Sequence, residues 1–309
     1  VVEIYLPIAE QSMNVFVLLG LGAAAGLLAG MFGVGGGFLA TPLLIFVGIP
    51  PAVAVASQAN QVVANSISSL QVQWRRGNVD LRMGLVLLLG GMIGSAGGVW
   101  LFTYLKRIGQ IDFVIAVLYV VMLSTIGLLM LAESLRTYVR RRRNPEAPRG
   151  KLHTHYLVHR LPLKLRFYKS KLYISALLPV GLGFLIGVLS AILGVGGGFV
   201  LVPAMIYLLG MPTAVVIGTS NFQILFVAAN VTFLQSVTNG TVDVVLALLL
   251  IMGGVVGAPI GSRLAAKLPG VVLRGLMSVL ILAVAAELLT ELLRTPSSLY
   301  SLGTREAMP

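Results

Sequence analysis

The chain has 309 residues, of which 57% are hydrophobic and only 10% are charged, and this composition excludes an ordinary water-soluble domain. Residues 136–171 hold twelve of the 22 Lys and Arg residues and one of the ten acidic residues, so they carry +11 of the net charge of +12. No face of alternating aromatic and basic residues accompanies this segment, so the charge does not indicate nucleic-acid binding.

Residues 1–14 are polar and acidic, so the sequence predicts no cleavable signal peptide at this end. Five apolar segments follow, at residues 15–31, 38–47, 52–74, 83–105 and 111–131. Most of them are long enough to cross a hydrocarbon core of about 30 Å as a helix, whereas 38–47 is too short. Backbone groups in lipid must be paired internally, so these segments are expected to be helices.

The second half of the sequence repeats the first. The run GVGGGF at residues 33–38 recurs at residues 194–199, an offset of 161. Further matches follow in the same order: Pro42 and Pro203, Gly48 and Gly210, Ser57 and Ser220, Asp80 and Asp243, and Gly94 and Gly257. So many ordered matches indicate an internal duplication, with five more apolar segments between about residues 173 and 293.

The distribution of basic residues predicts the orientation of the two halves. If the basic segment is cytoplasmic, eighteen of the 22 Lys and Arg residues lie on that side and four on the other. The turn at 77–80 then lies inside and its repeat at 240–243 outside, so the halves are expected to be inverted. Both chain termini fall on the outer side.

The predicted fold is therefore an all-α polytopic membrane protein built from two inverted repeats of about five segments. Broken or re-entrant half-helices are expected at the glycine runs. The expected divisions are a first transmembrane repeat (1–135), a basic cytoplasmic loop (136–172), a second transmembrane repeat (173–295) and a C-terminal tail (296–309).

The glycine runs are the first candidate binding elements. Glycine permits close backbone approach and positive φ, so successive amide groups can converge on an anion, and each run opens a short helix whose positive end favours negative charge. The candidate glycines are Gly35, Gly36, Gly37, Gly196, Gly197 and Gly198. The alternative is that these glycines only permit tight helix packing.

Polar side chains in the third segment of each half are the second candidate element. The candidates are Ser57, Gln58, Asn60 and Gln61, with Ser220, Asn221 and Gln223 in the repeat. A hydrogen-bonding stripe at helical spacing is predicted through Ser57, Gln61, Asn65 and Ser68. These residues indicate a wet substrate path, and their alternative role is hydrogen bonding between helices.

Other chemistry has little support in the sequence. The chain has no cysteine, and its three histidines all lie in the basic segment without a carboxylate partner, so no metal site, cofactor or catalytic residue is predicted. The few acidic residues near segment ends, among them Asp80 and Asp243, are expected to cap helices rather than to couple transport to protons. A permease for another small anion, a permease for a metal cation and an integral membrane enzyme are the remaining alternatives.

The paired GVGGGF motifs, each followed by Pro42 or Pro203 and then by Ser57 or the run at 218–221, resemble the TauE/SafE family of sulfite and organosulfonate exporters. The resemblance covers nearly the whole chain and implies a bacterial inner-membrane permease for a small sulfur-containing anion. It also implies that the two glycine motifs and the adjoining polar helices form the substrate site. The expected partners are this anion and the lipid bilayer, while the oligomeric state is left open.

Overall fold

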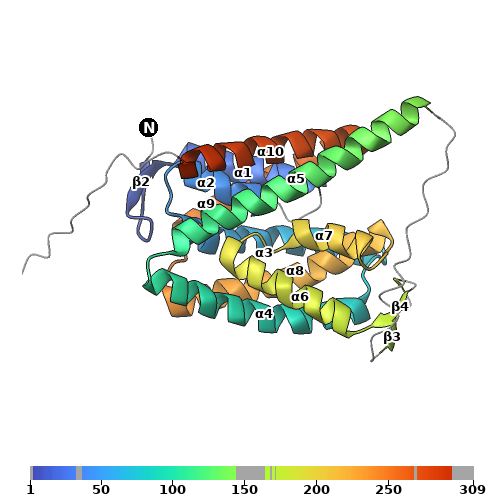
Figure 1. The fold of residues 1–309 in the computed structure, drawn as a ribbon. Helices are drawn as coiled ribbons and strands as arrows, with labels where there is room; N and C mark the ends of the chain where they lie inside the picture. Colours follow the sequence, from blue (N-terminus) through green and yellow to red (C-terminus); the bar gives the residue numbers. More distant parts are fainter. Residues whose placement is uncertain are drawn as a thin grey trace, which may run out of the picture.

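The computed structural model describes residues 3–32, 37–143, 164–167, 169–170, 172–267 and 270–293. The described residues form ten helices and two antiparallel hairpins (Figure 1). The first half contains β1 (Glu3–Leu6), β2 (Gln11–Asn14), α1 (Val15–Phe32), α2 (Gly37–Phe46), α3 (Pro51–Arg75), α4 (Leu81–Arg107) and α5 (Ile111–Arg143). The five segments expected here are confirmed as helices.

The second half repeats the same order of elements. It contains β3 (Lys164–Phe167), β4 (Leu172–Ser175), α6 (Leu177–Leu193), α7 (Gly198–Tyr207), α8 (Thr213–Asn239), α9 (Val244–Lys267) and α10 (Gly270–Leu293). The first residues of the two hairpins, Glu3 and Lys164, are as far apart in the sequence as the two glycine runs. The alternation of polar and apolar residues at 164–167 indicates an extended segment where β3 lies, but the pairing of strands into hairpins was not expected. Each hairpin stands immediately before the first helix of its half.

The helices have the lengths and surfaces of a membrane bundle. Among the described residues, five helical stretches are long and apolar enough to cross a membrane: Leu81–Arg107, Ile111–Arg136, Val215–Asn239, Val244–Gly261 and Gly275–Leu293. α2 and α7 have ten residues each, about 15 Å of helix, so they are half-helices as expected. Large apolar side chains such as Trp100 and Val237 are each 71% exposed, as lipid-facing residues would be.

Sequence signals at the helix ends explain where several helices start and stop. Pro51 stands in the first turn of α3, where its missing N–H has no intrahelical partner to lose. Asp80 caps α4 by accepting the backbone N–H of Met83, at 3.2 Å. Asp243 caps α9 in the same way through Leu246, at 3.1 Å. The capping role expected for these two acidic residues is therefore confirmed.

Helices of one half pack against helices of the other, with α1 lying along α9. A Cβ atom added at Gly22 would lie 2.6 Å from the carbonyl oxygen of Leu250, and one added at Gly26 would overlap the backbone of Gly254. As the contact moves along α1 from Gly22 to Gly26, its partner in α9 advances from Leu250 to Gly254, so the two helices run parallel. Only glycine permits two helices to approach so closely.

The equivalent pair, α4 and α6, uses the same device. A Cβ atom added at Gly90 would overlap the carbonyl oxygen of Val180, and one added at Gly94 would overlap that of Phe184. The partner again advances along its helix, from Val180 to Phe184, so these two helices also run parallel. The first helix of each half thus packs against the fourth helix of the other half.

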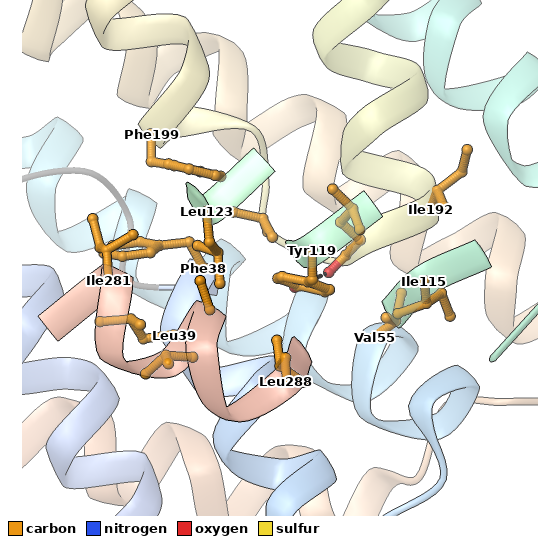
Figure 2. Packing of buried hydrophobic residues seen from close by; sticks show 14 of the residues in the cluster. Phe38, Leu39, Val55, Ile115, Tyr119, Leu123, Ile192, Phe199, Ile281 and Leu288 are labelled. Atoms are coloured by element: carbon orange, nitrogen blue, oxygen red, sulfur yellow. Dashed lines mark hydrogen bonds between the residues drawn. The ribbon is translucent and has the colours of Figure 1, made fainter. Parts of the chain in front are cut away.

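A buried apolar cluster holds the two half-helices against α5 and α10 (Figure 2). Phe38 and Phe199, at the starts of α2 and α7, both belong to it and are at most 2% exposed. Tyr119 of α5 is fully buried and donates its hydroxyl hydrogen to the carbonyl oxygen of Leu193, at 2.5 Å. This bond fixes the end of α6 immediately before the second glycine run.

Replacing Gly90 by alanine is expected to destabilise the fold by about 1–3 kcal/mol, because the new methyl group would force α4 and α6 apart. Gly97 on the same helix is the matched control, since a Cβ atom there would meet nothing within 4 Å. Gly97→Ala should be neutral or slightly stabilising. Thermal unfolding of both variants in the same detergent measures the difference, and equal melting temperatures would contradict the packing described here.

Candidate functional site

The second glycine run forms a tight turn between α6 and α7. Gly194, Gly196 and Gly197 have φ values of +67°, +69° and +71°, a left-handed conformation that side chains rarely adopt. Gly198 is the first residue of α7. In the first half, Gly35 and Gly36 lie outside the described residues, and Gly37 begins α2.

The starts of the two half-helices lie against each other. The rings of Phe38 and Phe199, the last residues of the two motifs, stack with centroids 5.1 Å apart and an angle of 23° between their planes (Figure 2). A Cβ atom added at Gly37 would lie 3.1 Å from the carbonyl oxygen of Val195. Two motifs from opposite halves of the sequence therefore meet inside the bundle.

The glycine turn packs on the two polar helices, α3 and α8, which contact each other. A Cβ atom added at Gly196 would overlap the side chain of Val62 on α3 and would lie 2.9 Å from that of Ile224 on α8. Both side chains are buried. The turn therefore marks a point where α3 and α8 come together, and in each helix the polar candidates come directly before the residue that contacts it.

On α3, two of the four candidates hold the scaffold together. Gln61 is fully buried and donates from its amide nitrogen to the carbonyl oxygens of Gly22 (3.1 Å) and Leu250 (2.9 Å). This amide therefore links α3 to both α1 and α9. The hydroxyl of Ser57 accepts the backbone N–H of Asp243, at 2.9 Å.

The other two α3 candidates differ in exposure and partners. Asn60 is half-buried and donates to the carbonyl oxygen of Ser57 in its own helix, at 3.3 Å. Gln58 is fully buried and donates to Oε1 of Gln61, at 2.8 Å. In the part of the chain that is described, its own Oε1 has no hydrogen-bond partner. Because Gln61 must point its nitrogen at two carbonyl oxygens, the orientation of the Gln58 amide is fixed as well.

On α8, the candidates are less completely paired. Ser220 and Asn221 donate to the carbonyl oxygen of Ile217, at 3.2 and 2.8 Å. The Oδ1 atom of Asn221 and both amide atoms of Gln223 are buried and have no partner within the described residues. Leaving a buried polar group unpaired costs about 1–3 kcal/mol. These unpaired atoms therefore lower the stability of the fold, which is not expected of residues with a purely structural role.

Gln61 and Gln223 occupy equivalent places in the two halves. A Cβ atom added at Gly254 would lie 2.6 Å from the amide nitrogen of Gln61, and one added at Gly91 would lie 2.7 Å from that of Gln223. These two glycines correspond to each other in the duplication. The two side chains thus lie in similar surroundings, but the amide of Gln61 is fully hydrogen-bonded, whereas that of Gln223 has no partner among the described residues.

Thr219 is a residue that the sequence-based candidates omitted. Its hydroxyl accepts the backbone N–H of Asp80 at 3.0 Å, as the hydroxyl of Ser57 does for Asp243. Ser57 therefore corresponds in function to Thr219, and its alignment with Ser220 was wrong by one residue. The sequence does hold a signal for this pair. In each half, a hydroxyl residue seven positions after a Pro (Pro50 or Pro212) is followed by an aspartate in the loop after the helix.

The predicted polar stripe is correct for three residues and wrong for the fourth. Ser57, Gln61 and Asn65 are buried, whereas Ser68 is exposed and donates to the carbonyl oxygen of Ala64 in its own helix. Beyond Ser66 the helix turns its side chains outward. A hollow of about 410 Å³ lies there, lined by four apolar residues and two polar ones: Ile67, Leu70, Trp74 and Leu225, with Gln71 and Arg75.

The later polar residues of α8 serve as ties between helices. Asn230 donates to Ser95 of α4 at 2.8 Å, and Gln235 donates to the carbonyl oxygen of Ala191 at the end of α6, at 3.3 Å. These bonds fit the structural alternative for polar residues in membrane helices. Within the described ranges no group of three or more His, Asp or Glu residues could hold a metal ion, and the three histidines lie outside them.

Comparison with known proteins places this arrangement in a family. A "Probable membrane transporter protein" of Xylella fastidiosa (strain 9a5c) is 29% identical over 258 residues, which cover 82% of this chain and 86% of the relative. In Bacillus subtilis (strain 168), "Probable membrane transporter protein YunE" is 24% identical over 289 residues, covering 90% of this chain and 98% of the relative. "Probable membrane transporter protein YjnA" of the same strain is 29% identical over 283 residues, covering 90% and 100%.

No solved structure matches the chain significantly. The family model described as "Sulfite exporter TauE/SafE" matches residues 18–288, which include both glycine runs, both polar helices and both aspartate caps. The resemblance of the two motifs to this family is thereby confirmed over nearly the whole chain. The chain belongs to the TauE/SafE family of membrane proteins.

Proposed function

We propose that this protein is a secondary transporter that carries a small sulfur-containing anion, sulfite or an organosulfonate, out across the bacterial inner membrane by alternating access. The family's description and the names of the relatives support transport, and the family's description supports the choice of anion. The observation that carries the proposal is that Gln58, Asn221 and Gln223, on the two helices that contact the glycine turn, hold buried amide atoms without a partner among the described residues.

The proposed site combines two kinds of group. Backbone amides of Gly35, Gly36, Gly37, Gly196, Gly197 and Gly198 would face the oxyanion. Side chains near the meeting point of α3 and α8 would complete its hydrogen bonds, with Gln58, Asn221 and Gln223 in direct contact. Ser57 and Gln61 are already engaged by Asp243, Gly22 and Leu250, so we assign them to positioning these contacts.

The unpaired atoms also favour a particular form of the anion. Gln58 and Asn221 each present an oxygen, because their amide nitrogens are already committed to other acceptors. A carboxamide oxygen accepts hydrogen bonds, so it suits a ligand that carries a proton to donate. Hydrogen sulfite and amino- or hydroxysulfonates have such a proton, whereas a fully deprotonated dianion has none. We expect the former to be the better substrates.

Alternating access requires two related halves that can move against each other, and we infer that they are inverted. α3 runs parallel to α9. Ser57 contacts Asp243 just before α9 begins, and Gln61, one turn later in α3, contacts Leu250 further along α9. α8 and α9 are joined by a short connection, 240–243, so they run in opposite directions. α3 is then antiparallel to α8, its own repeat. Basic residues would place the Asp80 end of the bundle on the cytoplasmic side.

Flux through proteoliposomes tests the function directly. Purified protein in vesicles loaded with sulfite or taurine should release at least one of them faster than protein-free vesicles at the same lipid composition. Sulfate serves as the dianion without a donatable proton and should be released more slowly. Absence of flux for all the sulfur anions would reject the proposal.

The two equivalent glutamines give a sharper test. Methionine has the length of glutamine without its polar atoms, so Gln223→Met should raise the melting temperature by removing an unpaired amide worth about 1–3 kcal/mol, while transport falls at least about tenfold. Gln61→Met is the matched variant. It removes three hydrogen bonds and should lower the melting temperature. If Gln223→Met transported normally, the unpaired amide would not be part of the site.

The glycine turn gives a separate prediction. Gly196→Ala should reduce both stability and flux, because it forces a side chain into a left-handed backbone and into contact with Val62. Gly210→Ala shares the strained φ, at +73°, but its Cβ atom would meet nothing within 4 Å. Thermal unfolding and flux should therefore be affected more at Gly196. Adding Val62→Ala to Gly196→Ala should recover part of the loss, and a lack of recovery would exclude crowding as its cause.

A further inference from the structure

Asp80 joins three separate elements at one end of the bundle. Its Oδ1 atom caps α4 through Met83. Its Oδ2 atom accepts the backbone N–H of Ser170 at 2.9 Å and the hydroxyl hydrogen of the same residue at 2.6 Å, in the turn of the β3–β4 hairpin. Its own backbone N–H donates to Thr219 of α8. The carboxylate is only 3% exposed.

Asp243 makes the same three connections at its own end. Its Oδ1 atom caps α9 through Leu246, and its Oδ2 atom accepts the backbone N–H of Ile8 at 3.0 Å, in the turn of the β1–β2 hairpin. Its backbone N–H donates to Ser57 of α3. This carboxylate is fully buried. A buried carboxylate is stable only with such partners, and hydrogen bonds to an ionised group are stronger than neutral ones.

Each hairpin reaches across to the other half of the molecule. β1–β2 precedes the first repeat and binds the aspartate of the second, while β3–β4 precedes the second repeat and binds the aspartate of the first. The two hairpins lie at opposite ends of the bundle (Figure 1). Because the hairpins have the same spacing in the sequence as the glycine runs, the two clusters are equivalent parts of the duplication.

We propose that Asp80 and Asp243 are positioning residues that latch the two ends of the transport path, and that each end opens only when its aspartate releases the hairpin. The proposal rests on alternating access. Ser57 and Thr219, which the aspartates hold, immediately precede Gln58 and the Ser220–Asn221 pair in the proposed site. Release of a hairpin therefore loosens one substrate helix at one end, whereas the other end stays closed.

The two latches differ in strength in this structure. The Asp80 latch has two bonds from Ser170, and Lys169 adds bonds from its ammonium group to the carbonyl oxygens of Gly77 (3.2 Å) and Val79 (3.1 Å). The Asp243 latch has a single bond from its hairpin among the described residues. The end of the bundle that holds Asp80 is thus the more firmly closed.

Asparagine at each aspartate separates the latch from the helix cap. Asn is a good N-cap residue, so its oxygen can still accept from Met83 or Leu246. Its nitrogen replaces the second carboxylate oxygen and cannot accept from the hairpin. Asp80→Asn and Asp243→Asn therefore remove the same interaction at opposite ends and serve as controls for each other.

Single-cysteine labelling can report the opening of each end, because the wild-type chain contains no cysteine. Suitable reporters are Val216→Cys in α8 and Ala54→Cys in α3, which are both fully buried. The first lies one turn before Thr219, and the second one turn before Ser57, so the two reporters are equivalent. The probe is a water-soluble maleimide applied to the purified full chain in detergent and in lipid nanodiscs.

Asp80→Asn should raise the labelling rate at position 216 at least about tenfold and leave the rate at position 54 unchanged or lower, since a hydrogen bond to an ionised group is worth more than about 1.4 kcal/mol, the value that corresponds to a tenfold change. Asp243→Asn should have the opposite pattern. Ser170→Ala removes only one bond and should shift position 216 in the same direction by less. Equal changes at both positions, or none in either variant, would overturn the latch.

Two further measurements keep the test decisive. Melting temperatures of the Asn variants identify general unfolding, which would raise labelling at both positions together. If an Asn variant does not fold, the Ser170→Ala result decides the proposal alone at the Asp80 end. Because labelling requires no substrate, a positive latch result with no sulfur-anion flux would reject the proposed substrate and leave the latch intact.

Discussion

Hydrogen-bonding groups buried in an apolar bundle must find partners inside the protein, and this constraint shapes most of the structure. Gln61 meets it by bonding two helix carbonyl groups from different elements, and the aspartate caps meet it by drawing in hairpin turns from the opposite half. Among the described residues, the amide atoms that do not meet it belong to Gln58, Asn221 and Gln223, on the two helices that contact the glycine turn. Buried amide groups without a partner mark a place where a ligand would be expected.

Glycine has two distinct uses here, and separating them clarifies which glycines concern function. Along α1 and α4 it lets helices of the two halves touch backbone to backbone, which fixes their spacing. At residues 194–197 it supplies left-handed φ and ends one helix so that another can begin at once. The two uses involve separate contacts, because the turn itself packs against Val62 and Ile224.

The apolar segments, the half-helices and the aspartate caps could be predicted because each depends on local sequence: a hydrophobic length, a glycine run, or an acidic residue before a helix. The hairpins could not. KLRF of β3 alternates and indicates an extended segment, but nothing local indicates its pairing with β4. EIYL and QSMN are short and show no clear alternation, and the bond that anchors their turn joins Ile8 to the distant Asp243. The different states of Gln61 and Gln223 were also beyond prediction, because the partners of Gln61 lie in α1 and α9, far from it in the sequence.

Duplication gives the two halves equivalent positions, but residues at equivalent positions can have different roles. If the ligand bound symmetrically on the axis between the halves, Gln61 and Gln223 would be equally free to meet it. Gln61 is instead fully occupied by α1 and α9, whereas its counterpart has both amide atoms unpaired in the described structure. A ligand that completes these bonds, and that also meets the Oε1 atom of Gln58, would therefore find unequal partners in the two halves.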